Sequence, residues 1–426
     1  MGRECQLTKA SINAYAKKFS RYFTAFFKWV FLSCITGIVG GAAGTFFRSC
    51  IMYVTGIRSA NGWIVYFLPL GGLLIVFLYR ACKINEPHGT NLILSAIRSP
   101  EPIPLIMAPL IFLSTVLTHL FGGSAGREGA ALQLGGSLGF SIGRLFRLDE
   151  KDLHIITMSG MAACFSALFG TPMTSTIFVM EVVTVGVMYY AALVPCALSA
   201  IVAAGVAKHF ESPVTAYTIE NIPSIDILPL LRVAALAVLC AFVSVIFCTA
   251  MSKAGQYYKK FFPNQYARAA AGGALLVLLS LVFGSDYLGM GGGIIDASMN
   301  GSARPEAFIL KILFTAVTLE AGFRGGEIVP AFFVGSTFGC FMGGILGISP
   351  SFGASIGFMS VFCGVTNCPL TAFVLSLEVF GAKGAVYYLL AAGISYMLSG
   401  YSGIYSEQKI LYAKDKPLFI GNGPHG

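Results

Sequence analysis

The sequence predicts an all-α polytopic membrane protein built from two inverted-topology halves of broken and tilted helices. Hydrophobic residues make up 56% of the 426 residues, charged residues only 11%, and the mean hydropathy is +0.77. That composition is typical of chains that cross a bilayer many times. Many apolar runs contain Gly or Pro, or are shorter than the roughly 20 residues of a straight span. We therefore expect helices that break within the membrane and line a cavity.

Charge and cysteine usage exclude several other classes of protein. The net charge of +9 could indicate nucleic-acid binding, but the basic residues are scattered near the ends of apolar runs. Anchoring at the cytoplasmic face of a lipid bilayer explains them better, so we expect no nucleic-acid partner. The eleven cysteines show no CxxC spacing, which indicates buried free thiols without a metal site. No HExxH, Cys/His cluster or Ser-His-Asp pattern is present, so we expect no enzyme activity and no cofactor.

The ends of the chain predict its orientation. Residues 1–28 are polar and basic, show no cleavable signal peptide, and are predicted to form a cytoplasmic, interfacial segment. Lys409, Lys414 and Lys416 place the C-terminus on the same side. An even number of crossings follows, in a multi-pass protein of the plasma (inner) membrane with both termini cytoplasmic.

One long polar break divides the apolar part of the chain. It covers residues 209–225 and is predicted to link a first transmembrane half, 29–208, to a second half, 226–414. A short C-terminal tail, 415–426, completes the chain.

The two halves repeat one another. A shift of 200 residues matches Gly and Thr positions, and a shift of 197 matches a Pro-x-Thr pattern followed by Glu. If each half makes an odd number of crossings, the repeats are inverted, and their substrate site lies near mid-membrane where helix ends converge. The matched pairs include Thr118/Thr318, Gly126/Gly326, Gly135/Gly335, Gly160/Gly357, Pro172/Pro369, Thr174/Thr371 and Glu181/Glu378.

The turn Gly126-Arg127-Glu128-Gly129 opens an apolar helix and is the strongest candidate site. Free backbone amides at a helix N-terminus bind anions, and the Glu128 carboxylate can act there as a tethered anion. The alternative is a glutamate that merely stabilises the helix end. Because a charge within a membrane is costly and usually functional, we favour a functional role.

Five motifs resemble the CLC family of anion transporters and cover nearly the whole chain. They are GREGA at 126–130, FGTPMTSTIFVMEV at 169–182, GGEIVP at 325–330, NCPLTAFVLSLEV at 367–379 and GIYSEQKIL at 403–411. The resemblance implies a homodimer with one anion pathway in each subunit.

The resemblance also implies roles for single residues. Glu128 is similar to the family's gating glutamate, which competes with anions and carries a proton. The amides near Ile328 and Val329 would bind the anion from the second half, and Tyr405 would offer its hydroxyl, with Tyr396 and Tyr401 as alternatives. The predicted anion-binding residues are Thr90, Asn91, Gly126, Arg127, Gly129, Ile328, Val329 and Tyr405. Of these, Arg127 is read mainly as a charge that sets the local field.

Three departures from the chloride pattern resemble the fluoride/proton antiporter branch of the family. The chain reads Gly-Thr-Asn-Leu-Ile at 89–93 in place of Gly-Ser-Gly-Ile-Pro, Val182 in place of an internal proton glutamate, and an acidic Glu327 in the second turn. The resemblance therefore implies proton-coupled export of fluoride, with Glu128 and Glu327 as the gating and proton-coupling pair. Val329 departs in the other direction, since that branch carries a hydroxyl there. A passive chloride channel and a chloride/proton antiporter of the same fold remain alternatives.

The other intramembrane charges receive structural roles. His119, Glu320 and Arg324 are expected to form paired structural charges near the two turns. Glu181 and Glu378 end matched helices, and this symmetry favours a structural role for both.

Overall fold

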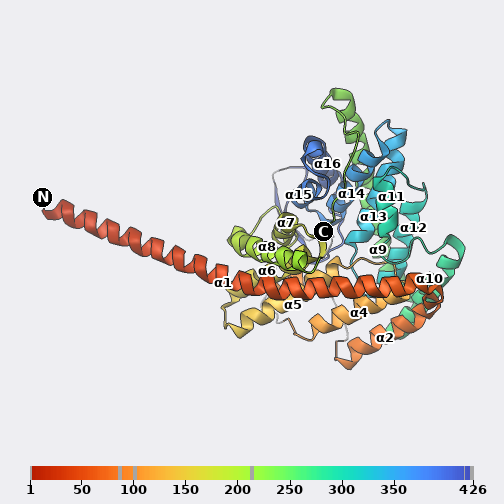
Figure 1. Cartoon of the computed structure of the whole chain (residues 1–426), viewed down its shortest axis with the longest axis horizontal. Coiled ribbons are helices and arrows are strands. Elements are labelled where there is room, and N and C mark those ends of the chain that lie inside the picture. Colours follow the sequence, from red (N-terminus) through yellow and green to blue (C-terminus); the bar gives the residue numbers. More distant parts are fainter. Residues whose placement is uncertain (1, 85–88, 99–102, 212–214, 417, 423–426) are drawn as a thin grey trace.

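The computed structural model of the chain describes residues 2–84, 89–98, 103–211, 215–416 and 418–422, with side chains described between Lys17 and Ile420 (Figure 1). Helices dominate it, in agreement with the predicted class. The α-helices of the described residues are α1 Gly2–Ala60, α2 Leu68–Ala81, α3 Thr90–Ala96, α4 Met107–Phe121, α5 Glu128–Leu145, α6 Glu150–Phe169, α7 Pro172–Glu181, α8 Leu193–His209, α9 Ile227–Phe261, α10 Gln265–Phe283, α11 Gly292–Met299, α12 Ala307–Glu320, α13 Ile328–Ile345, α14 Pro350–Thr366, α15 Pro369–Phe380 and α16 Ala385–Leu398. Three short 3-10 helices are η1 Gly62–Phe67, η2 Tyr190–Ala192 and η3 Ala382–Gly384.

Helix lengths confirm the expectation of broken and half-spanning helices. Among the described residues, seven helical stretches are long and apolar enough to cross a membrane, including α6 and α9. Others are far too short for a straight span, such as α3 with 7 residues and α7 with 10. Helix α7 begins with Pro172 in its first turn, where proline is tolerated because that position needs no amide donor.

The predicted interfacial segment, 1–28, and the start of the predicted first transmembrane half, at 29, lie in one continuous helix. This helix, α1, has 59 residues and runs from Gly2 to Ala60. Its N-terminal part extends away from the rest of the chain (Figure 1). No Pro occurs before Ala60 and no Gly between Arg3 and Thr36, so the sequence holds no local signal to end a helix there. Further along, Gly40 packs α1 closely against α6: a Cβ at Gly40 would lie 2.7 Å from the Ala163 Cβ.

A small three-stranded sheet accompanies the helices and was not predicted from the sequence. Strand β1, Thr184–Val185, pairs in parallel with β2, Lys409–Tyr412, and β2 pairs antiparallel with β3, Phe419–Asn422. The β-branched residues 182–185 favour a strand, and Gly186 follows with a φ of 93°. The sheet splits the apolar run 172–208 and joins the end of the chain, including part of the predicted tail, to its first half.

Reciprocal hydrogen bonds relate the two halves. The Glu181 carboxylate accepts from the amide and hydroxyl of Thr371, at 2.8 and 2.5 Å. Glu378 accepts in the same way from Thr174, at 2.7 and 2.5 Å. A contact in which each side offers the same groups to the other is the mark of a two-fold rotation. The pairs that the sequence shifts matched are thus brought into mutual contact by α7 and α15.

Matched glycines set the closest helix contacts in each half. A Cβ at Gly135 would lie 2.2 Å from the Gly160 carbonyl oxygen, between α5 and α6. A Cβ at Gly335 would lie 2.3 Å from the Gly357 carbonyl oxygen, between α13 and α14. Small residues let membrane helices approach until their backbones touch. The Gly-rich repeat therefore encodes the same helix pair twice.

Replacing Glu181 by alanine is expected to lower the free energy of unfolding by about 2 kcal/mol, because buried donors lose a charged acceptor. Glu181 is 5% exposed, so water cannot easily replace the carboxylate. Denaturant unfolding in mild detergent measures the change, with exposed Glu220→Ala as the matched control. Equal stability of the two variants would contradict the structural role of Glu181.

Candidate functional site

The two glycine-rich turns meet at the start of α5 and α13. The Gly126 amide donates to the Gly326 carbonyl at 2.7 Å, and the Gly326 amide donates back to Gly126 at 2.9 Å. The turns are also held from outside, where the Ser124 amide donates to the Thr318 hydroxyl at 3.0 Å. Two helix N-termini from opposite halves of the chain thus lie side by side, which is the arrangement expected of a mid-membrane anion site.

The Glu128 carboxylate lies across both helix ends. Its Oε2 accepts from the Arg127 amide at 3.0 Å and from the Val329 amide, in the first turn of α13, at 3.3 Å. Glu128 is fully buried, and its Oε1 has no hydrogen-bond partner. A Cβ at Gly126 would lie 2.1 Å from Oε2, so a larger residue there would displace the carboxylate from this position. The side chain therefore occupies the position where helix-end amides would bind a free anion.

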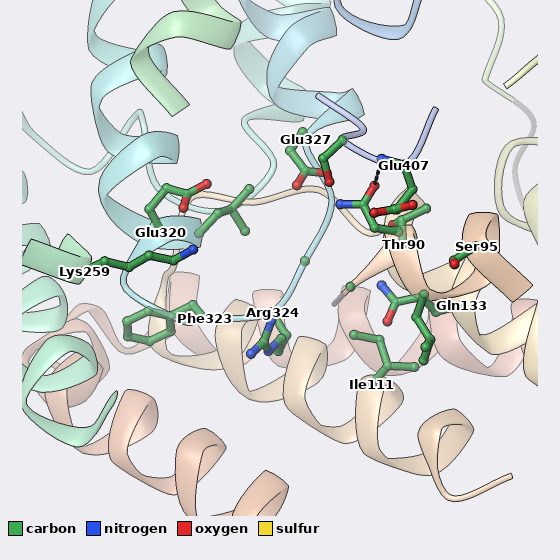
Figure 2. Close-up of a pocket in the computed structure, with 16 residues that line it drawn as sticks. Thr90, Ser95, Ile111, Gln133, Lys259, Glu320, Phe323, Arg324, Glu327 and Glu407 are labelled. Carbon is green, nitrogen blue, oxygen red and sulfur yellow. Dashed lines mark hydrogen bonds between the residues drawn. The ribbon is translucent and has the colours of Figure 1, made fainter. Parts of the chain in front are cut away.

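Glu327 lies at the same junction but faces a cavity. It is the N-cap residue of α13, makes no side-chain capping bond, and is partly exposed. The cavity has a volume of about 590 Å³ and is mostly polar at its wall. Figure 2 shows Glu327 near Thr90, with Glu320 and Lys259 further along the wall. The Glu128 carboxylate is thus buried at the junction of the two helix ends, whereas Glu327 lines a cavity large enough to hold water.

Thr90 and Asn91, the two polar residues of the Gly-Thr-Asn-Leu-Ile segment at 89–93, both line this cavity. The Thr90 hydroxyl donates to the Gly129 carbonyl at 3.4 Å. A Cβ at Gly129 would lie 2.8 Å from the Thr90 hydroxyl oxygen. Asn91 accepts from the Glu407 amide at 3.3 Å (Figure 2). The segment that contains Glu407 therefore contacts the start of α3. The spacing of the motifs in the sequence does not predict this contact.

Gln133 is a cavity residue that the sequence reasoning missed. It lies one turn beyond Gly129 on α5, donates to the Gly129 carbonyl at 3.2 Å, and has no partner for its Oε1. The available signal was a single amide side chain in the apolar run of α5. It adds a buried amide side chain to the cavity wall on the helix that begins with Glu128.

Tyr405 is the late tyrosine whose surroundings include both glutamates. It is 2% exposed, its hydroxyl has no hydrogen-bond partner, and its electrostatic neighbours include Glu327 and Glu128. Tyr396 instead lies against Lys414, with 4.2 Å between the ammonium and the ring centroid. Tyr401 lines a separate cavity. An unpaired buried hydroxyl beside the anion position leaves a donor free for a ligand.

The remaining predicted residues divide into backbone and side-chain contributors. Arg127 and Val329 offer their amides to Glu128, while the Arg127 guanidinium, 7% exposed, has no partner for Nε and Nη1. Ile328 is fully buried at the first position of α13 and contributes no polar side chain.

The expected pairing of His119, Glu320 and Arg324 does not occur. In the described part of the chain none of the three makes an ion pair within 4.0 Å. Arg324 lies over the Tyr79 ring at 4.7 Å, and Glu320 lines the cavity. His119 is fully buried away from both, since its position at the end of α4 points it to another part of the molecule. Sequence proximity to the two turns was a poor guide to contact.

Comparison with known proteins places the chain among anion transporters. The model of the voltage gated chloride channel family matches residues 71–400. A Pseudomonas syringae pv. tomato protein described as a chloride/fluoride channel protein is 34% identical over 400 residues, which cover 92% of this chain and 88% of that protein. The H(+)/Cl(−) exchange transporter ClcA of Vibrio cholerae is 25% identical, with 94% and 92% coverage.

Two solved structures share the fold. A CLC-type fluoride/proton antiporter superposes with a TM-score of 0.87 and 31% identity, covering 90% of this chain and 98% of the other. A slow cyanobacterial Cl−/H+ antiporter gives a TM-score of 0.75 at 18% identity, with 87% and 94% coverage. With two paired glycine-rich turns, a carboxylate across both helix ends and a family match over most of its length, the chain belongs to the voltage gated chloride channel family, the CLC family.

Proposed function

We propose that the protein is a fluoride/proton antiporter that exports fluoride from the cytoplasm. The observation that carries the proposal is the Glu128 carboxylate bound to the amide of Val329 at the anion position, with a second carboxylate, Glu327, on the adjoining cavity wall. Names of relatives support it: a chloride/fluoride channel protein and a CLC-type fluoride/proton antiporter, both above 30% identity. The protein moves its substrates without converting them chemically.

The geometry couples the two ions by competition. A halide that enters from the cavity needs the same amides that now bind Glu128. When the halide takes them, the displaced carboxylate is left in a dry environment, where the charged form is disfavoured and a proton is bound instead. Return of the carboxylate to the amides releases both the proton and the halide. Because anion and carboxylate cannot occupy the amides together, halide binding is linked to protonation of Glu128, and antiport results when the halide leaves to the outer side and the proton to the cytoplasmic side.

Fluoride fits the donors at this junction. It is a small anion that holds its hydration shell tightly, so a site must offer short, strong hydrogen bonds in its place. Backbone amides at two helix ends, the free Tyr405 hydroxyl and the amide of Gln133 can supply them. A tenfold preference over chloride needs only about 1.4 kcal/mol, which one additional good donor can provide. Glu327, when protonated, is such a donor.

One observation favours chloride as a second candidate substrate. Thr90 retains a hydroxyl at the position where chloride members carry serine, and it lies beside the Gly129 backbone. A chloride/proton antiporter or a passive chloride channel would use that hydroxyl. Val329 likewise removes a hydroxyl from beside Glu327.

Two further features belong to the proposal. We expect a homodimer with one anion pathway in each subunit. We also expect insertion in the plasma membrane with both termini in the cytoplasm, in accordance with the basic residues at both ends.

Efflux from liposomes tests the choice of substrate. Purified protein in vesicles loaded with fluoride or chloride is expected to release fluoride at least about ten times faster, with the membrane potential clamped by a potassium ionophore. Ion-selective electrodes measure both rates, and protein-free vesicles give the background. Equal or faster chloride efflux, saturating at lower concentration, would return the protein to the chloride branch.

A further inference from the structure

The segment 402–408 carries Tyr405 at its middle and is held by polar side chains on either side of it. Tyr405 is 2% exposed, and Glu128 and Glu327 are among its electrostatic neighbours. Among the described residues its hydroxyl has no hydrogen-bond partner. No bond of the hydroxyl itself therefore holds it, and its position depends on the packing of the ring and on the backbone that carries it.

Asn367 binds the segment on both sides of the tyrosine. Its Nδ2 donates to the Ser402 carbonyl at 3.1 Å and to the Gln408 Oε1 at 3.2 Å. Ser402 precedes Tyr405 by three residues, and Gln408 follows it by three. Asn367 is the C-cap residue of α14 with a φ of 57°, a left-handed conformation that asparagine adopts more readily than most residues. One amide group thus ties both ends of the segment to the end of α14.

Lys414 fixes the direction in which the Asn367 amide faces. Its ammonium donates to the Asn367 Oδ1 at 2.6 Å. The same ammonium donates to the Tyr396 carbonyl at 2.8 Å and to the Ser399 hydroxyl at 3.2 Å, which hold it in place. Because an ammonium can only donate, the atom that it contacts is the amide oxygen, and the NH2 group must face the segment.

Gln408 extends this chain of donors to the first half of the protein. Its Oε1 accepts from Asn367, so its Nε2 faces two carbonyls, those of Thr366 at 2.8 Å and Val182 at 3.1 Å. Gln408 and Asn367 are both fully buried, and a buried amide with partners for its oxygen and its nitrogen has one favoured orientation. These bonds join the segment to α14 and to the residue that follows α7.

We propose that Asn367 is a positioning residue for halide binding, which together with Lys414 and Gln408 holds the Tyr405 hydroxyl at the anion position. The inference rests on the proposed function, since the hydroxyl acts there as a donor to the transported ion. Asn367 does not line the cavity, so it acts through the segment. A hydrogen bond weakens steeply when its angle is lost, and loss of a bond to an ion lowers affinity at least about tenfold.

A double-mutant cycle with Tyr405→Phe tests whether Asn367 acts through the hydroxyl. Asn367→Asp keeps the side-chain size and the acceptor for Lys414 but removes the donor to Ser402 and Gln408. Each single variant is expected to raise the KM of fluoride efflux from liposomes at least about tenfold. The double variant is expected to raise it no further than Tyr405→Phe alone, whereas a general weakening of the fold would add to that effect.

Asn221→Asp is the matched control. Asn221 is exposed and has a φ of 58°, so the same chemical change in a similar backbone conformation should leave the KM at the wild-type value. If Asn367→Asp does not fold, Lys414→Met, which frees the Asn367 amide to rotate, replaces it in the cycle with exposed Lys416→Met as control. An unchanged KM in the folded variant or in Tyr405→Phe, or additive effects in the double variant, would overturn the proposal.

The proposed function fails separately. The cycle is run with whichever halide the wild-type protein releases faster. Chloride-selective efflux, or efflux without proton movement, would contradict fluoride/proton antiport. Effects on the KM of that halide that are not additive would still uphold the role of Asn367, because the cycle measures only whether the asparagine and the tyrosine hydroxyl act together.

Discussion

Glu128→Gln is expected to abolish proton-coupled halide transport, reducing the proton flux to that of protein-free vesicles. The carboxylate is fully buried and accepts hydrogen bonds from the amides of Arg127 and Val329. A glutamine of the same size can occupy this position through its carbonyl oxygen, but it cannot carry a proton at any accessible pH. Coupling therefore stops even if an uncoupled anion leak persists. A pH-sensitive dye outside fluoride-loaded vesicles measures the effect.

Glu220→Gln is the matched control for this experiment. Glu220 is an exposed carboxylate in the segment between the two halves, so the same chemical change there should leave the proton flux at the wild-type level. Undiminished proton movement driven by a fluoride gradient in Glu128→Gln would remove this residue from the coupling mechanism.

Glu327→Gln is expected to slow proton-coupled fluoride transport at least about tenfold while leaving the fold intact. Glu327 lines the cavity beside the anion position and makes no capping bond that would hold α13 in place. Its loss removes an acid that can donate a strong hydrogen bond to fluoride, and one such bond accounts for about 1.5–3 kcal/mol. Fluoride efflux and thermal unfolding in detergent report the two parts of the expectation.

Glu407→Gln provides the control within the same cavity. Glu407 also lines the wall, but its carboxylate is paired with Arg98 at 3.2 Å and its residue is exposed. We expect near wild-type efflux from this variant. If both substitutions slow fluoride equally, Glu327 acts only through the charge of the cavity. If neither does, Glu327 has no role in transport.

Much of the architecture could be predicted because the two halves of the sequence repeat the same pattern of residues. The shifts that matched Gly126 with Gly326 and Glu181 with Glu378 correspond to hydrogen bonds between the halves. Glycine repeats of this kind carry physical information, since only glycine allows two backbones to touch. The position of Glu128 at a helix start could be predicted because a glycine-rich turn precedes an apolar run there.

Other features needed tertiary contacts that no local pattern contains. The sheet that joins Thr184 to Lys409 depends on segments more than two hundred residues apart. In the sequence Gln133 is a single amide in an apolar run, and only the fold shows that it lines the cavity. Lys311 resembles an ordinary charge near a helix start, and only the fold shows it fully buried beside Arg58. Long-range packing therefore decides which polar residues line the cavity and which are buried elsewhere.

Uphill proton movement tests the central claim most directly. Vesicles containing wild-type protein are loaded with fluoride and placed in fluoride-free solution at equal pH, with the membrane potential set to zero by a potassium ionophore. Outward flow of fluoride is predicted to draw protons inward against the gradient that they build, so the outer solution becomes alkaline. The signal should vanish in Glu128→Gln vesicles and in protein-free vesicles. Fluoride efflux without any proton movement, or proton movement driven as well by chloride, would contradict fluoride/proton antiport.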